Sequence, residues 1–183
     1  MNRALAAVLV VASGAVAIPL WLAAREPSEP FAAASGSSSG QCPSAEPNVG
    51  RRTGLSAKEP MVPGGASAVT LCVYKPDLQV QGGWRIDAPA TVRRGAGAIV
   101  ESLNSMGPAK PNEAGCFLAL RTQYRLLIDY PDRPTAVVDV DMNCALVSSG
   151  DAVREGDVSD TLDVFAEAFR DEGGQIEAPP WKW

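Results

Sequence analysis

QYRLLIDYPDRPTAVVDVDMNCALV (residues 123–147) is the stretch that decides the fold. Apolar and polar residues alternate on both sides of the central PDRP, which predicts two β-strands joined by a turn at residues 131–133. Opposite residues of an antiparallel pair share one face, so burying the apolar residues of both strands together sets Arg125 opposite Asp139. The sequence therefore predicts an antiparallel hairpin with a solvated, weakly stabilising ion pair on its exposed face.

The second of these strands also carries the first half of a calcium-binding pattern. Asp139, Asp141 and Asn143 stand at alternate positions, as the first three ligands of a calcium loop do. However, Cys144 stands where the loop needs a glycine for its sharp turn, and Gly150 stands where it needs a bidentate glutamate. VVDVDM alternates strictly, as a strand does. We therefore interpret the aspartates as the solvated side of a strand and predict no metal site.

Catalytic arrangements find little support in the sequence. Asp139 and Asp141 could act as paired carboxylates, but that chemistry needs one acid with a raised pKa inside a cleft, and a solvated strand face is the reverse. GSSSG (residues 36–40) matches the G-x-S-x-G of a nucleophile elbow but lies in a low-complexity segment. The chain contains no histidine, which removes Ser-His-Asp and Cys-His arrangements. We therefore expect no catalytic residues and no cofactor.

Two further strands and two helices complete the predicted domain. SAVTLCVY (residues 67–74) predicts an inner strand and GGWRID (residues 82–87) a short second one. An apolar stripe and an early proline predict a helix over residues 89–103. A second helix is predicted over residues 159–174, capped by Ser159 and ended by two glycines. The predicted fold is α+β: a small, mainly antiparallel sheet of about four or five strands, with one helix packed on a face, a C-terminal helix beside it, and stabilising disulfides.

The four cysteines form an even set, which we interpret as two disulfides of a protein outside the cytoplasm. No pair has the C-x-x-C spacing of a redox motif or a zinc knuckle. Of the possible connectivities, we favour Cys42–Cys72 and Cys116–Cys144. The second pairing is attractive because Cys144 is expected to face inward beside Met142, and the alternatives would cross the hairpin.

The N-terminus predicts a targeting segment at residues 1–24. Arg3 precedes an uncharged, mostly apolar run over residues 4–24. This length is nearer to the about 20 residues of a spanning helix than to the about 7–15 of a cleaved signal, although AVA at residues 15–17 offers a cleavage site. We expect a single-pass membrane anchor with the C-terminal domain outside the cell membrane. The alternative is a secreted protein.

The remaining chain divides by composition. Residues 25–66 are rich in Pro, Gly, Ser and Ala and predict a tether. Residues 67–174 form the predicted extracytoplasmic α+β domain, and residues 175–183 form a tryptophan-containing tail. In this tail Trp181 and Trp183 could pack back on the domain, lie at a membrane interface, or contact a partner.

A succession of short motifs carries a resemblance to known sequences. It runs through CP (residues 42–43), LCVY (71–74), APATVRRGAGAIVESLN (88–104), a cysteine before a strand, and VDVDMNCALVSSG (138–150). Over residues 62–166 the chain resembles an actinobacterial family of secreted, membrane-anchored or lipoprotein-like proteins of unknown function. This resemblance implies topology and location but no chemistry, because the family has no established active site.

These observations favour a binding role over an enzymatic one. We expect an extracytoplasmic, non-enzymatic module that binds an envelope protein or a wall component, with the membrane as a partner through the N-terminal segment. Nucleic acid is not an expected partner, because the net charge is −5 and the basic residues are scattered. One alternative is a secreted proteinase inhibitor, for which YKPDLQVQGG (residues 74–83) is the only candidate loop. A carboxylate-based hydrolase is the other.

Overall fold

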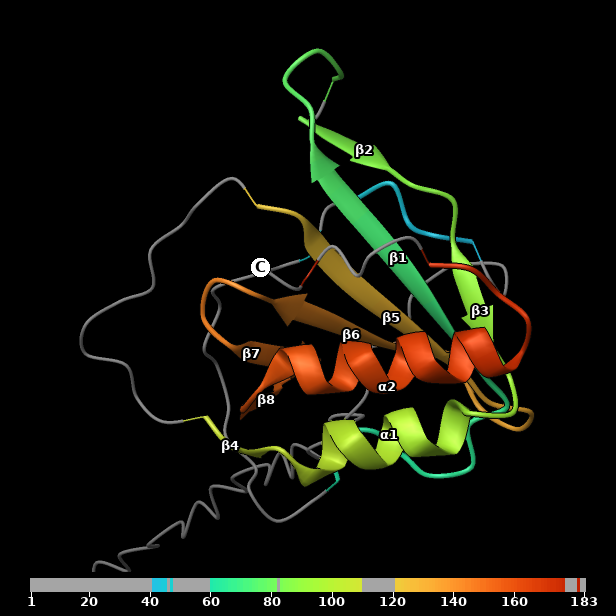
Figure 1. Cartoon of the computed structure of the whole chain (residues 1–183). Helices are drawn as coiled ribbons and strands as arrows, with labels where there is room; N and C mark the ends of the chain where they lie inside the picture. The colour runs from blue at the N-terminus through green and yellow to red at the C-terminus, as the bar shows by residue number, and fades with distance from the viewer. Residues whose placement is uncertain are drawn as a thin grey trace, which may run out of the picture.

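The computed structural model describes residues 41–45, 47, 60–81, 83–109, 121–176 and 181 (Figure 1). These residues form an α+β fold in which an antiparallel eight-stranded sheet is covered on one face by two helices. The predicted fold class is confirmed, but the sheet is larger than the expected four or five strands. The additional strands are short, with two to four residues each.

The sheet is antiparallel, and its outermost strands are short. Its spatial order is β2-β1-β5-β6-β7-β8-β4, and β3 also pairs with β1. The strands are β1 (Ala68–Pro76), β2 (Trp84–Ile86), β3 (Ala90–Val92), β4 (Gly107–Pro108), β5 (Gln123–Asp129), β6 (Ala136–Asp141), β7 (Leu146–Ser149) and β8 (Ala152–Glu155). β1 is therefore an inner strand, as predicted.

The predicted register of the central hairpin is confirmed. β5 and β6 pair antiparallel with Arg125 opposite Asp139 and Tyr124 opposite Val140. One face of this hairpin packs on the helices, as the alternation of apolar residues requires.

The predicted second strand of the hairpin, however, ends early, at Asp141. The Asp141 Oδ1 accepts hydrogen bonds from the backbone N–H of Asn143 (2.9 Å) and of Cys144 (3.3 Å), and Ala145 has a φ of 52°. A side chain that satisfies the backbone in this way favours a turn over a strand. Cys144 therefore lies in a turn. The prediction that it faces inward beside Met142 is wrong. It packs against a small separate cluster of Ala109, Leu146 and Val153.

The first helix also begins later than predicted. Residues 90–92 form β3, and α1 spans Ala96–Ser105. The edge of β1 carries backbone groups that need partners, and the β-branched pair Thr91-Val92 supplies them in an extended conformation. Thr70 and Thr91 add a hydroxyl–hydroxyl hydrogen bond of 2.9 Å across this pairing.

The second helix, α2 (Val158–Asp171), agrees with the sequence except at its cap. Asp157, and not Ser159, is the N-cap, because its Oδ1 accepts the N–H of Ser159 at 2.9 Å. At the other end Gly173 has a φ of +87° and donates to the Arg170 carbonyl, while Gly174 donates to the Phe169 carbonyl, both at 2.9 Å. These two bonds form a Schellman motif and confirm the predicted glycine terminator.

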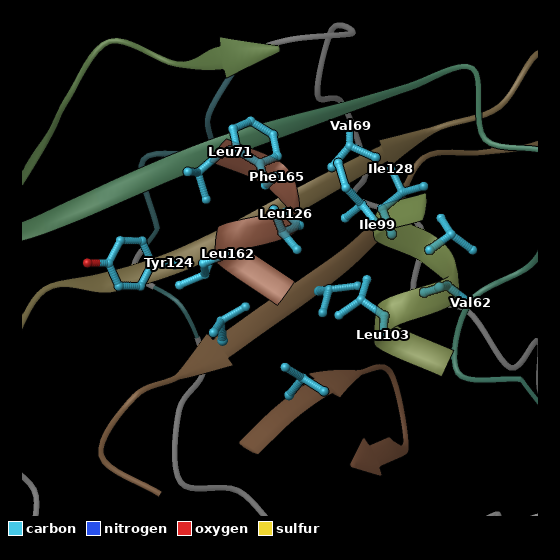
Figure 2. Packing of buried hydrophobic residues seen from close by; sticks show 14 of the residues in the cluster. Val62, Val69, Leu71, Ile99, Leu103, Tyr124, Leu126, Ile128, Leu162 and Phe165 are labelled. Atoms are coloured by element: carbon cyan, nitrogen blue, oxygen red, sulfur yellow. The ribbon is translucent and has the colours of Figure 1, made fainter. Parts of the chain in front are cut away.

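The main core lies between the helices and the sheet (Figure 2). Two residues of the predicted tether, Met61 and Val62, belong to it. Asn104 of α1 holds Val62 by two hydrogen bonds, one from the Val62 N–H (3.1 Å) and one to its carbonyl (2.9 Å). The side chains that Figure 2 labels come from both layers and from this segment: Val62, Val69, Leu71, Ile99, Leu103, Tyr124, Leu126, Ile128, Leu162 and Phe165.

On the opposite face of the sheet, residues 42–45, which we call the strap, lie against β1 and β5. The predicted disulfide Cys42–Cys72 joins the strap to the middle of β1. The Tyr74 hydroxyl donates to the carbonyl of Pro43 at 2.7 Å, and the Arg125 Nη1 donates to that of Ala45 at 3.0 Å. Part of the predicted tether is thus fixed to the domain.

The strap changes the environment of the predicted ion pair. Arg125 Nε lies 2.6 Å from Asp139 Oδ1, but the two side chains are only 9% and 12% exposed. Asp141 is also buried. The prediction of a solvated aspartate face is therefore wrong, because alternation along β6 shows which residues share a face and not what covers that face.

Candidate functional site

The candidate site is a groove of about 500 Å³ beside the outer edge of β1. Apolar side chains form most of its wall, and three polar residues lie among them. Ligand sites in proteins typically have such a volume and such an apolar lining with few polar groups. We call it the β1 groove, and its described residues are Leu71, Val73, Lys75, Asp87, Ala88, Pro89, Ala90, Phe169, Gln175, Ile176 and Trp181.

The first wall arises because two separate strands share the edge of β1. β3 pairs with residues 69–71 and β2 with residues 74–76. Between them the Asp87 N–H donates to the Val73 carbonyl at 3.0 Å. The chain then passes through Pro89, which has no N–H to donate, so pairing stops until β3. This interruption of the edge leaves the groove between β2 and β3.

Trp181 forms part of the second wall. The Trp181 indole N–H donates to Asp163 Oδ1 at 2.9 Å, and its ring meets that of Tyr124 edge-on, with centroids 5.7 Å apart. Trp181 is only 2% exposed. Trp181 thus packs on the domain, which is the first of the three roles considered for it, and it also lines the groove. Trp183, the other candidate partner contact, lies outside the described residues.

An ion pair stands at one end of the groove. Lys75 Nζ lies 2.6 Å from Asp87 Oδ2, and Arg85 Nε lies 4.0 Å from the other oxygen of Asp87. All three side chains are partly exposed, so each contact contributes about 0–1 kcal/mol. A charged group of a ligand could therefore replace one partner at little cost.

The hairpin of β1 and β2 extends from this end of the groove, past the rest of the sheet (Figure 1). Its turn is held by backbone hydrogen bonds from Asp77 to Gly83 (2.8 Å), from Val80 to Asp77 (3.3 Å) and from Gly83 to Val80 (3.0 Å). Leu78 is 84% exposed at its tip and Val80 is 38% exposed. This turn lies within the loop that the sequence offered as a proteinase-inhibitor loop.

The aspartates considered from the sequence lie elsewhere, on the strap side of the sheet. Asp139 is bonded to Arg125, and one oxygen of Asp141 holds the turn after β6. Within the described part of the chain, no group of three or more His, Cys, Asp or Glu side chains could hold a metal ion. Asp139 thus contributes to the pairing of β5 with β6, and Asp141 contributes to the turn that follows β6.

A smaller cavity of about 400 Å³ lies between α1 and α2. Beside it, one oxygen of Glu172 accepts the backbone N–H groups of Arg93 (2.8 Å) and Arg94 (2.6 Å). Desolvation would raise the pKa of Glu172, but hydrogen bonds from the N–H groups of Arg93, Arg94 and Gly95, with the charge of Arg94, outweigh it and lower that pKa. Glu172 thus ties the end of α2 to the start of α1.

The predicted cysteine pairing can be followed for three of the four residues. Cys42 and Cys72 pair with each other, and Cys144 is disulfide-bonded as well. The predicted partner of Cys144 is Cys116, which lies outside the described residues.

A scan against protein-family models finds no family that matches this chain, and searches of the curated proteins and of the solved structures find no match either. The resemblance to an actinobacterial envelope family therefore stays a prediction that rests on its motifs.

Membrane attachment was predicted at residues 1–24, which lie outside the described part of the chain. No helix within the described ranges is long and apolar enough to cross a membrane.

Proposed function

We propose that this protein is an extracytoplasmic, non-enzymatic binding module of the cell envelope, and that the β1 groove holds its ligand. The observation that carries the proposal is the groove itself, an apolar cavity of about 500 Å³ with a single ion pair at its end. The ligand class that suits it is an apolar segment of an envelope protein or wall component, ending in a polar group that reaches Lys75 or Asp87.

The charges of the groove suit ligand binding. Ligand sites typically hold a few placed polar groups that fix the orientation of the ligand. Lys75 and Asp87, the charged residues among those described in the groove, contact each other at 2.6 Å. Their pairing suits them to orient a ligand.

The two alternatives receive less support. A protease accepts the loop of its inhibitor as an extended strand, whereas the turn at residues 77–83 is folded by the internal hydrogen bonds that Val80 and Gly83 donate. A carboxylate-based hydrolase would need Asp139 or Asp141 in a cleft. Both lie in the sheet away from the groove, and Asp139 is bonded to Arg125.

Location outside the cytoplasm is supported by the use of cysteine. Disulfides persist in oxidising compartments and stabilise small extracellular domains. The Cys42–Cys72 bond fixes the strap to the sheet, so reduction would loosen a segment that bonds to Tyr74 and Arg125.

The test is site-specific crosslinking in cells that produce the 183-residue chain. A photoreactive amino acid at Gln175, in the groove wall, should capture a specific envelope component. The same group at Asp151, exposed in the turn between β7 and β8, is the control and should not capture it.

A second substitution connects the capture to the groove. Ala88→Trp fills the groove from an exposed position and should abolish the adduct from Gln175, whereas Ala98→Trp, at an exposed alanine of α1, should leave it unchanged. An adduct that survives Ala88→Trp, or that forms equally from Asp151, would remove the groove as the binding site.

A further inference from the structure

The tip of the β1–β2 hairpin is an apolar projection. Among the described residues, Leu78 and Val80 are the large apolar side chains that are exposed, at 84% and 38%, and both lie in this one turn. Single exposed apolar side chains are ordinary on protein surfaces. Two of them at the end of a projecting hairpin form a contact surface (Figure 1).

The backbone of this turn is already hydrogen-bonded within itself. The N–H groups of Asp77, Val80 and Gly83 donate to carbonyls of the same turn, and the N–H of Gln79 donates to Asp77 Oδ1 at 3.0 Å. A segment that leaves water for a lipid environment must keep its backbone polar groups satisfied, because no water is there to replace lost partners. The turn meets this requirement at these four N–H groups before it contacts anything.

Behind the apolar tip, the hairpin carries first an aromatic residue and then charged residues. Trp84 lies opposite Pro76 and is partly exposed on one face of the hairpin. Lys75 lies opposite Arg85 on the other face, although like charges in opposed positions repel each other. Asp87 lies within 4.0 Å of both cations and offsets part of that repulsion. An aromatic residue followed by long basic side chains is typical of protein segments at a lipid–water interface.

We propose that the hairpin tip inserts into the surface of a phospholipid bilayer. Leu78 and Val80 enter the boundary of the acyl chains, Trp84 lies among the headgroups, and Lys75 and Arg85 reach lipid phosphates. Insertion is driven by apolar burial, because the net charge of the chain is −5 and the hairpin carries acidic residues beside its basic ones. Binding is therefore weak and reversible.

A lipid surface suits this tip better than the cleft of a protein partner. The two apolar side chains stand at the end of a narrow turn with cations on one face behind it and an aromatic ring on the other. That order follows the change from hydrocarbon to headgroup to water.

The test places a fluorescent reporter at the tip of the 183-residue chain. Leu78→Trp is compared with Asp132→Trp, at an exposed position of the β5–β6 turn, and the emission of the parent chain is subtracted from both. Vesicles of phosphatidylglycerol and phosphatidylethanolamine should shift the emission of Leu78→Trp to shorter wavelength, and bromine-labelled acyl chains should quench it. Asp132→Trp should show neither effect. Equal responses at the two positions, or no response at position 78, overturn the proposal.

The reporter reads the tip itself, so membrane attachment through residues 4–24 cannot imitate the result. In a second arm, Val80→Asp is added to Leu78→Trp and should reduce the quenching about tenfold, since it places a charge in the inserted turn. The melting temperature should not change, because position 80 is exposed and outside the core. If position 78 responds to an envelope protein extract but not to vesicles, the partner is a protein and the proposal is wrong.

Discussion

Arg125 and Asp139 face each other across β5 and β6 in a contact of 2.6 Å that the strap shields from water. The guanidinium also lies over the ring of Tyr74, with 5.7 Å between Arg125 Cζ and the ring centroid. Each charge thus has its partner in the protein. The loss of either would remove the opposite charge that the other contacts in this largely buried position.

We therefore expect Asp139→Asn to lower the free energy of unfolding by about 3–5 kcal/mol, the usual cost of breaking a buried pair. Asp132→Asn is the matched control, because Asp132 pairs with Arg133 at 3.2 Å on the surface and its loss should cost less than about 1 kcal/mol. Urea unfolding measures both. Equal losses in the two variants would contradict the burial of the Arg125–Asp139 pair.

Trp181 should contribute strongly to stability although it lies close to the C-terminus. We expect Trp181→Ala to lower the free energy of unfolding by about 3–5 kcal/mol, as truncation of a buried aromatic residue does. Leu78→Ala is the control at an exposed apolar position and should change it by less than about 0.5 kcal/mol. Thermal unfolding measures both, and an unchanged melting temperature after ending the chain at Ala178 would exclude the packing of Trp181.

All three tyrosines should resist ionisation while the protein is folded. Burial raises the pKa of Tyr124 and of Tyr130 to about 12, and burial also raises the pKa of Tyr74 against the opposing charge of Arg125. An unfolded tyrosine ionises near pH 10. Between about pH 10 and pH 12 the unfolded chain therefore loses protons that the folded chain keeps, so stability falls as pH rises.

The measurement is phenolate absorbance recorded beside circular dichroism on raising the pH. The phenolate signal should appear together with the loss of the folded spectrum. Tyr130→Phe removes the ionisable hydroxyl together with its hydrogen bond to the Pro63 carbonyl. In this variant the stability of the fold should decrease less steeply as the pH rises. Reversible titration near pH 10 with an intact folded spectrum would show that the tyrosines are accessible.

Glu172 should support the contact between the helices only in its ionised form. The pKa of Glu172 is lowered in the folded protein because backbone N–H groups and Arg94 outweigh its desolvation. Its stabilising effect is thus fully present above the pKa of an unfolded glutamate, about 4.3. The effect is lost as the pH falls through the lower pKa that Glu172 has in the folded protein. Glu172→Gln should therefore reduce stability at neutral pH and weaken its dependence on acid pH.

Glu167→Gln, at an exposed glutamate of α2, is the control for this prediction. Urea unfolding from neutral to acid pH should give nearly the parent curve for it. If the two variants behave alike, the hydrogen bonds to Arg93 and Arg94 do not stabilise the fold.

The disulfides can be checked by peptide mapping without reduction. A Cys42–Cys72 peptide is expected, and a Cys72–Cys144 peptide would contradict it. Replacing Cys42 and Cys72 together by serine should lower the free energy of unfolding by about 2–4 kcal/mol, because the unfolded chain would no longer be crosslinked.

Features set by near neighbours in the sequence could be predicted. Alternation fixed the register that places Arg125 opposite Asp139, because an error of one residue would turn every apolar side chain to the wrong face. The helical period located the buried side of α2, including Leu162 and Phe165, and two glycines marked its end.

Features that depend on contacts between distant segments could not be predicted from the sequence. β3 is extended because β1, some twenty residues earlier, offers it an unpaired edge, while its own sequence fits the start of a helix equally well. The strap contacts Arg125, the partner of Asp139, from a segment whose composition predicts a tether. The β1 groove has no motif either, since it arises where two strands share one edge and Trp181 returns to the sheet.

The position of the Cys42–Cys72 bond also decides how the domain responds to mechanical force. Tension on the chain before Cys42 enters the fold at Cys72, in the middle of β1, a strand hydrogen-bonded along both of its edges. The 30-residue separation between the two cysteines is closed covalently, so the segment between them cannot lengthen under load. The domain is thus held at an inner strand of its sheet and not through a terminal segment.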